Sequence, residues 1–262
     1  MPSVGRASGY ETDPYRHVRS NDRYILVGGG TRGTQRWEQP ADERSQDLPV
    51  ERADTCRRSV RYKNKRSFQG FYPVFSTGQY VWHESLLELT SLMWLDRAGA
   101  LRGVATQPFA VIGPHAFRHY IDFAFLQPDG VRAMVAVKPR RAIDADLRAT
   151  FRTLNAVCRA IGWRFIVMSD MSRTEMYALQ WQWVYREPWN ALPTEAHARL
   201  FDAAQSPISL GEASTIACPS DPSRGLVGIY HELWRRSLVL VSPGTLRLGS
   251  LVVQRDGGGR AH

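Results

Sequence analysis

The pattern of hydrophobic and polar positions divides the chain into three parts. Residues 1–55 are polar and rich in Gly, Pro, Arg, Asp and Glu, without a sustained apolar period, which is typical of a flexible arm. A folded pattern begins near Phe68. The residue composition changes again after Asp170, where the chain becomes rich in aromatic residues and then shows a helical pattern. We therefore expect a flexible N-terminal arm, one domain over 56–170, and a helical linker with a further domain over 171–262.

The middle part predicts an α/β core. A segment of β-type residues, broken by a Thr-Gly turn, precedes an apolar pattern of helical spacing that ends at Gly99. The chain then continues with two strands, a Pro-Asp-Gly turn, a returning apolar strand, an amphipathic helix and a buried strand. The predicted elements after the first segment lie at residues 83–99, 104–112, 117–126, 131–139, 144–162 and 163–170. This order describes an α/β fold with a mixed sheet and flanking helices.

The last part predicts a winged helix. An aromatic-rich segment, 174–189, is expected to be helical up to Pro188 and to serve as the linker. Three helices and two strands around Ser-Pro-Gly follow, which is the winged-helix order. They are predicted at residues 194–205, 209–217, 221–237 and, for the two strands, within 238–255.

The charge balance favours a polyanionic partner, with nucleic acid first. The formal net charge is +9 and the pI is about 9.8. Residues 57–66 carry six positive charges and no acid, which suits either an arm that grips a DNA backbone or a solvated linker. The candidate DNA-binding residues are Arg57, Arg58, Arg61, Lys63, Lys65, Arg66, Arg140 and Arg141, of which the last two suit a solvated pair equally well.

Other features of the composition argue against several classes of protein. The N-terminus has no apolar signal region and no stretch is long enough to cross a bilayer. Three distant cysteines, without a CxxC or Cys/His cluster, indicate neither a zinc site nor a disulfide framework. We therefore expect a cytoplasmic protein with reduced cysteines and no membrane partner.

The predicted hairpin carries the residues that suggest chemistry. Asp122 lies on one strand and Lys138 on its partner, so regular pairing can bring Asp122 beside residues 136 and 138 on one face. The chain has only three lysines among 34 basic residues, and Lys138 alone lies outside the basic run. A lysine in an arginine-dominated chain is a candidate for a position where arginine would not serve. A plain cross-strand ion pair is the alternative.

A helical glutamate, Glu88 or one turn earlier Glu84, can lie over the same sheet. Phosphodiester hydrolysis uses carboxylates to hold Mg²⁺ and a lysine to stabilise developing charge near the attacking water. Asp122, Glu88, the main-chain carbonyl of Val137 and Lys138 would supply these groups, with Mn²⁺ expected to substitute for Mg²⁺.

The run from Ser85 to Asp170 resembles TnsA, the endonuclease subunit of heteromeric cut-and-paste transposons. Five motifs in matching order carry the resemblance: S-L-L-E-L (85–89), Q-P-F (107–109), Y-I-D-F (120–123), A-V-K-P (136–139) and W-R-F-I-V-M-S-D (163–170). The winged-helix interpretation agrees with that family's second domain.

The resemblance implies a PD-(D/E)xK restriction-endonuclease-like fold and Mg²⁺-dependent cutting of the 5′ strands at transposon ends. It also implies two partners, an integrase-type (TnsB-like) transposase and an AAA+ (TnsC-like) regulator. The family's catalytic residues fall on Glu88, Asp122 and Lys138. One departure is Ala136, where the family has a glutamine or an acid, so a catalytically lapsed assembly subunit remains an alternative. A stand-alone restriction or repair nuclease is another.

Three further polar residues have ordinary explanations in the sequence. His115 and His119 lie four apart beside a Gly-Pro, which favours loop or surface histidines over a metal site. Gln107 precedes Pro108 and is expected to be structural.

Overall fold

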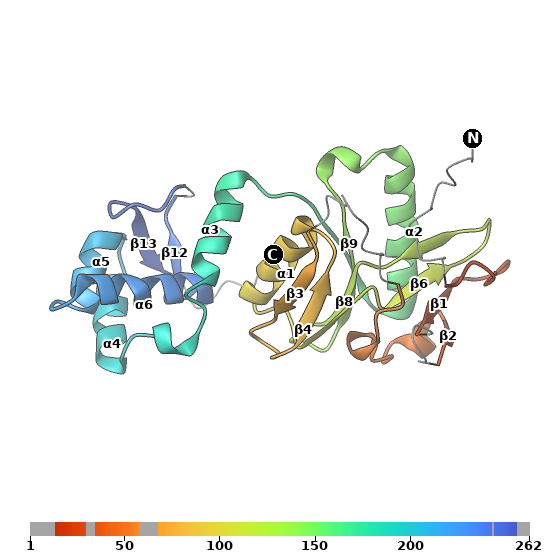
Figure 1. Ribbon diagram of the computed structural model, residues 1–262, viewed down its shortest axis with the longest axis horizontal. Helices are drawn as coiled ribbons and strands as arrows, with labels where there is room; N and C mark the ends of the chain where they lie inside the picture. The colour runs from red at the N-terminus through yellow and green to blue at the C-terminus, as the bar shows by residue number, and fades with distance from the viewer. Residues whose placement is uncertain (1–13, 30–34, 58–67, 243, 256–262) are drawn as a thin grey trace, which may run out of the picture. The chain divides into compact units, whose positions relative to one another are not determined.

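The computed structural model describes residues 14–29, 35–57, 68–242 and 244–255 (Figure 1). The chain forms two compact units. One comprises Met1–Leu92 and Gly99–Asp170, and the other comprises Met93–Ala98 and Met171–His262. The mixture of sheets and helices confirms the expected α/β class.

The first unit contains a mixed four-stranded sheet in the order β10-β9-β8-β5. β9 and β10 are parallel, and the other neighbours are antiparallel. The four strands are Arg164–Met168, Arg132–Val137, Phe123–Leu126 and Gly103–Thr106. Helix α2 (Ala145–Ile161) connects the parallel strands. In Figure 1, β8 and β9 lie between α2 and helix α1 (Leu86–Arg97).

Local sequence sets the limits of both helices. Asp144 caps α2 by accepting a hydrogen bond from the Leu147 N–H at 2.8 Å. Gly162 ends the helix in the left-handed conformation, at a φ of 89°. At α1, the Ser85 hydroxyl accepts a hydrogen bond from the Glu88 N–H at 3.1 Å. The Ser85 cap places Glu88 in the first turn of α1.

A second four-stranded sheet, wholly antiparallel, has the order β2-β1-β6-β7. Its strands are Trp37–Pro40, Ile25–Gly28, Phe109–Ile112 and Arg118–Tyr120. The expectation of a flexible arm over 1–55 is therefore wrong for the described part of that range. β1 is completely apolar and buried, and it pairs with β6, more than eighty residues later. A pairing that distant leaves no periodic signal in the local sequence.

Two short 3-10 helices join this segment to the mixed sheet, η1 (Glu43–Ser45) and η2 (Val50–Arg52). Glu51 is buried and forms an ion pair with Arg132 of β9, with the Arg132 Nε and Glu51 Oε2 3.0 Å apart. Arg132 also donates a hydrogen bond to the Gln46 carbonyl. The N-terminal segment is thus anchored to the first unit through buried contacts.

The two strands predicted at 104–112 and 117–126 are each divided between the two sheets. Thr106 pairs with Phe123 in one sheet, whereas Ala110 pairs with Tyr120 in the other. The Ile121 N–H donates to the Phe109 carbonyl, so residues 107 and 108 together oppose the single residue 122. This is a β-bulge, a feature that bends a strand and redirects side chains. The sequence indicated only a proline interruption here.

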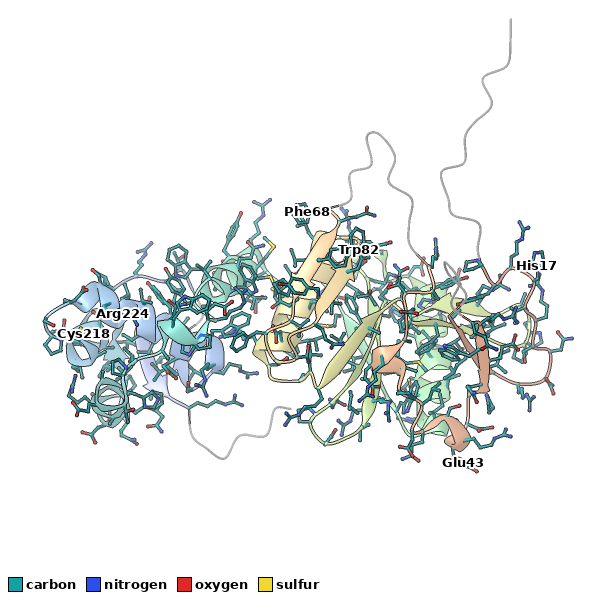
Figure 2. All side chains as sticks on the ribbon, turned by 60° about the horizontal axis from the view of Figure 1, so that its bottom comes forward. His17, Glu43, Phe68, Trp82, Cys218 and Arg224 are labelled. Atoms are coloured by element: carbon teal, nitrogen blue, oxygen red, sulfur yellow. The ribbon has the colours of Figure 1, made fainter. Side chains whose placement is uncertain are left out.

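A large apolar core lies where α2 covers both sheets. It contains Leu26 of β1, Phe109 and Val111 of β6, Ala124, Met134 and Ala136 of the mixed sheet, and Leu154, Val157 and Cys158 of α2. A short hairpin, β3 (Gly70–Pro73) and β4 (Tyr80–His83), precedes α1. Phe68 and Trp82, labelled in Figure 2, belong to its aromatic cluster.

The second unit contains four α-helices and a three-stranded antiparallel sheet in the order β11-β13-β12. The elements are α3 (Arg173–Trp183), η4 (Pro188–Asn190), α4 (Thr194–Ala203), β11 (Ile208–Ser209), α5 (Leu210–Ala217), α6 (Pro222–Arg235), β12 (Leu238–Leu240) and β13 (Leu251–Gln254). A core from α4, α5, α6, β12 and β13 holds the unit together. Gly225 permits close packing of α6 on α5, because an added Cβ would lie 2.1 Å from the Ser214 carbonyl oxygen. Within the residues described, no helix is long and apolar enough to cross a membrane.

Candidate functional site

The point at which the two sheets separate places the Asp122 side chain. The strand that enters this point as β7 of the antiparallel sheet, Arg118–Tyr120, continues from Phe123 as β8, which pairs with β9 in the mixed sheet. The Val137 N–H, at the end of β9, donates a hydrogen bond to Asp122 Oδ2 at 2.7 Å. The Asp122 N–H still donates to the Val135 carbonyl at 3.2 Å. The carboxylate therefore occupies a fixed position at the end of the strand.

Lys138 binds the same carboxylate. Its Nζ lies 3.1 Å from Asp122 Oδ2, and its main-chain N–H donates to the Met168 carbonyl of β10 at 3.0 Å. The Asp122 side chain is 15% exposed and that of Lys138 is 33% exposed. The structure thus brings together the aspartate and lysine that the sequence singled out. The pair is partly shielded, so its interaction is stronger than that of a fully solvated pair.

Glu88 is the third predicted residue. Its Oε2 accepts a hydrogen bond from the Glu84 N–H at 2.6 Å. Burial, together with the negative charges of Asp122 and Glu84, raises the pKa of the Glu88 carboxyl to about 7, although the hydrogen bond from the Glu84 N–H acts to lower it. Glu88 is therefore within electrostatic range of Asp122. A buried acid near another acid is a common feature of metal sites and of acid–base catalysts.

Two residues that the sequence analysis interpreted as ordinary also lie around Asp122. Gln107 donates its N–H to the Asp122 carbonyl at 2.9 Å, and it adopts a φ of 44°. A residue with a Cβ in that conformation costs on the order of 1 kcal/mol. Its Oε1 is buried without a hydrogen-bond partner. Only the tertiary structure reveals that Gln107 lies next to Asp122. In the sequence, Gln107 is marked only by its position before Pro108.

His119 is the second such residue, and it does not lie in an open loop. Its Nε2 is buried and has no hydrogen-bond partner. Burial lowers the pKa of His119, Lys138 lowers it further, and Asp122 opposes these effects. His119 is thus an electrostatic neighbour of the Asp122–Lys138 pair. His115, by contrast, is exposed.

Two other residues of the predicted site lie at the end of the same strand. Ala136 is completely buried in the core under α2, so its Cβ packs against apolar neighbours. The Val137 N–H donates a hydrogen bond to Asp122, and a metal-binding role for the Val137 carbonyl stays a prediction. Within the described residues, no three or more His, Cys, Asp or Glu side chains are grouped so that they could hold a metal ion.

The amide of Gln107 lies outside these four residue types and adds one oxygen donor beside Asp122. Asp122 and Glu88 supply carboxylate oxygens, and the two orphaned atoms of Gln107 and His119 are buried acceptors without a partner. To bind a cation through Oε2, Glu88 would have to give up the hydrogen bond that this oxygen accepts from the Glu84 N–H. A buried acceptor without a partner is costly and calls for an unseen ligand or water.

The predicted DNA-binding residues are only partly described. Arg58, Arg61, Lys63, Lys65 and Arg66 lie outside the described residues. The Arg57 guanidinium lies over the ring of Tyr120, 5.1 Å from its centroid. Arg140 and Arg141 are exposed in a 3-10 turn, η3 (Arg140–Ala142), that begins two residues after Lys138. The Arg140 N–H donates to Asp170 Oδ1 at 2.7 Å, which fixes this turn.

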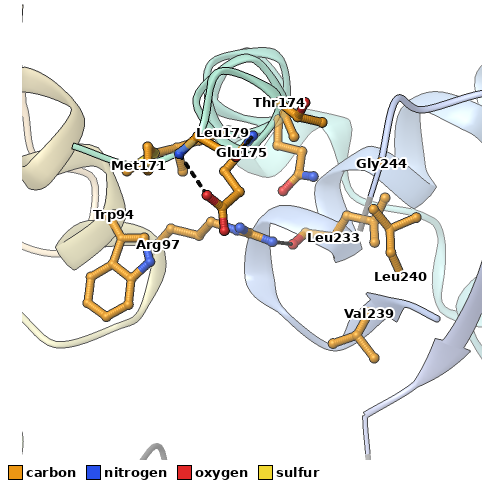
Figure 3. A pocket seen from close by; sticks show the side chains of 13 residues that line it. Trp94, Arg97, Met171, Thr174, Glu175, Leu179, Leu233, Val239, Leu240 and Gly244 are labelled. Atoms are coloured by element: carbon orange, nitrogen blue, oxygen red, sulfur yellow. Dashed lines mark hydrogen bonds between the residues drawn. The ribbon is translucent and has the colours of Figure 1, made fainter. Parts of the chain in front are cut away.

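A separate pocket of about 680 Å³ lies within the second unit (Figure 3). Trp94, Leu179, Leu233 and Leu240 form part of its lining, and Arg97 donates a hydrogen bond to the Leu233 carbonyl at 3.0 Å. Burial lowers the pKa of Arg97 to about 10. None of the residues around Asp122 lines this pocket.

No protein-family model matches this sequence, and no curated protein matches it either. The functional argument therefore rests on the residues and their geometry.

Proposed function

We propose that this chain is a metal-dependent DNA endonuclease subunit of a heteromeric transposase, which hydrolyses the 5′ strands at transposon ends. The observation that carries the proposal is the Asp122–Lys138 pair, held 3.1 Å apart at the point where the sheets separate. Glu88, which is electrostatically coupled to Asp122, supplies the second carboxylate.

The fold supports this proposal. The order of α1, the strands β5, β8 and β9, then α2 and β10 is that expected from the resemblance to PD-(D/E)xK nucleases. In the second unit, three helices with a small antiparallel sheet suit a winged helix. We assign the restriction-endonuclease-like fold to the first unit and the winged helix to the second on these grounds.

Each residue has a chemical role in this proposal. A bound Mg²⁺ or Mn²⁺ would polarise the scissile phosphate and lower the pKa of bound water. Asp122 and, once ionised, Glu88 would hold the cation through hard oxygen atoms. The Lys138 ammonium, oriented by Asp122, stabilises negative charge that develops on the phosphate. Arg140 and Arg141 are exposed two and three residues beyond Lys138, where they are placed to contact a DNA backbone.

The partners are proposed on the same resemblance. A subunit that cuts only 5′ strands requires an integrase-type transposase to process the 3′ ends, and an AAA+ regulator to control the assembly. The positive net charge of +9 supports DNA as the shared substrate.

The decisive experiment measures 5′-strand nicking of end-containing DNA by the full chain with its partner transposase, in Mg²⁺ and in Mn²⁺. We expect Asp122→Asn and Lys138→Met to reduce nicking at least about 100-fold, because each removes a charge at the reacting centre. Asn keeps an oxygen to accept the Val137 N–H, so the fold is preserved.

The matched control is Asp129→Asn. This substitution breaks an exposed ion pair between Asp129, in the turn that joins β8 to β9, and Arg164 of β10. This variant should nick normally. Nicking by Asp122→Asn at the wild-type rate would exclude the proposed site. Nicking by the wild type without any partner would favour a stand-alone nuclease.

A catalytically lapsed assembly subunit is the second candidate. Ala136 has no ligand oxygen and is buried in the core, and no ready cluster of metal-ligating acids and histidines exists among the described residues. A wild-type protein that supports complex assembly but never nicks, in either metal, would establish this alternative.

A further inference from the structure

Two residues next to Asp122 each carry a buried side-chain atom without a hydrogen-bond partner. Gln107 Oε1 and His119 Nε2 are both buried and lack a hydrogen-bond partner. Gln107 is hydrogen-bonded through its backbone to Asp122, and His119 is an electrostatic neighbour of Asp122 and Lys138. Two such atoms at one locus indicate a missing shared ligand, because buried acceptors are almost always satisfied.

The bulge explains how Gln107 reaches this position. Residues 107 and 108 together oppose Asp122, and Gln107 takes a left-handed φ of 44°. In the mixed sheet, β8 with Asp122 at its start lies between β5 and β9. Gln107 therefore flanks Asp122 on the β5 side, opposite Ala136 and Lys138 on the β9 side. Bulges of this kind redirect side chains beside active sites.

His119 approaches from the second sheet. Phe117 and Ile121 both pack against the core that contains Ala136. Because alternate residues of a strand share a face, His119 faces the same side. Its cross-strand partner, Val111, belongs to that core as well. The imidazole is thus directed to the side of the sheet on which residue 136 offers only a methyl group.

We propose that Gln107 Oε1 and His119 Nε2 are metal ligands that complete the coordination around Asp122, in place of any side chain from residue 136. The inference rests on the proposed metal-dependent function and adds the ligands and the metal preference of that site. Mg²⁺ takes oxygen ligands, whereas divalent transition metals, among which Mn²⁺ is the weakest binder, also accept an imidazole nitrogen. The site therefore prefers Mn²⁺ to Mg²⁺.

The test measures metal binding by the full chain without DNA, so it does not depend on cleavage. Mn²⁺ affinity is measured by titration calorimetry, and nitrogen coordination by the ¹⁴N modulation of the Mn²⁺ electron-spin-echo signal. We expect that modulation in the wild type and its loss in His119→Ala. Gln107→Ala and His119→Ala should each weaken Mn²⁺ binding at least about 10-fold, while His115→Ala, at an exposed histidine of the same hairpin, leaves it unchanged.

Fold integrity is monitored by thermal unfolding, and His119→Gln serves as a second variant that fills the same space without an imidazole. Mn²⁺ binding that requires Asp122 but is unchanged in the Gln107 and His119 variants would overturn the inference and leave the proposed function standing. Absence of Mn²⁺ binding in the wild type would also overturn it. The nicking assay then judges the proposed function separately.

Discussion

Glu88→Gln is expected to make the protein more stable at neutral and alkaline pH while it removes a residue proposed for catalysis. Burial, with the charges of Asp122 and Glu84, raises the pKa of Glu88 from 4.5 to about 7. Glutamine carries no charge, and its side-chain oxygen can still accept the Glu84 N–H. The substitution therefore removes the cost of ionisation while it keeps the local hydrogen bond.

The size of the effect follows from the pKa. The folded protein holds the Glu88 proton more tightly than the unfolded chain, so the free energy of unfolding falls as pH rises from about 4.5 to about 7. A rise from 4.5 to about 7 corresponds to roughly 3 kcal/mol in full. Because the side chain is only partly buried, water screens the effect, and we expect a difference of about 1 to 3 kcal/mol.

The assay is urea unfolding at about pH 4 and about pH 8 of the wild type, Glu88→Gln and Glu195→Gln, the last at an exposed helix position. Glu88→Gln should match the wild type at the lower pH and exceed it at the higher pH. A divalent cation should narrow this difference at the higher pH, because it stabilises only the ionised carboxylate. Parallel stability profiles of Glu88→Gln and the wild type over this pH range would refute the reasoning.

Three further substitutions test the packing. Glu51→Ala should cost about 3 kcal/mol in urea unfolding, because it removes the buried carboxylate partner of the half-buried Arg132, which keeps only the Gln46 carbonyl and the exposed Asp47; a loss below about 0.5 kcal/mol would mean that the N-terminal segment is not integral. Gly225→Ala should cost more than about 2 kcal/mol, because its Cβ would lie 2.1 Å from the Ser214 carbonyl oxygen; an unchanged melting temperature would contradict this packing. Ala136→Gln should lower stability by about 1 to 3 kcal/mol through overpacking of a fully buried position, and a melting temperature equal to that of the wild type would show an open pocket there.

The sequence determined those features that depend on neighbouring residues. Alternation and the Pro-Asp-Gly turn predicted the hairpin that contains Asp122 and Lys138, and the structure places their side chains 3.1 Å apart. Helical periodicity predicted α1, and with it the approach of Glu88 to the sheet. The α/β class followed from the order of these segments.

The tertiary structure alone decided the features that depend on distant segments. β1 acquires its strand partner β6 from more than eighty residues away, so its polar surroundings in the sequence suggested an arm. The division of each long strand between two sheets came from a bulge at Gln107, which local propensity does not reveal. The same division places Gln107 and His119 close to Asp122, and Ala136 is buried under α2. These outcomes are set by which surfaces pack together, because burial is a property of the assembled core and not of any local stretch of sequence.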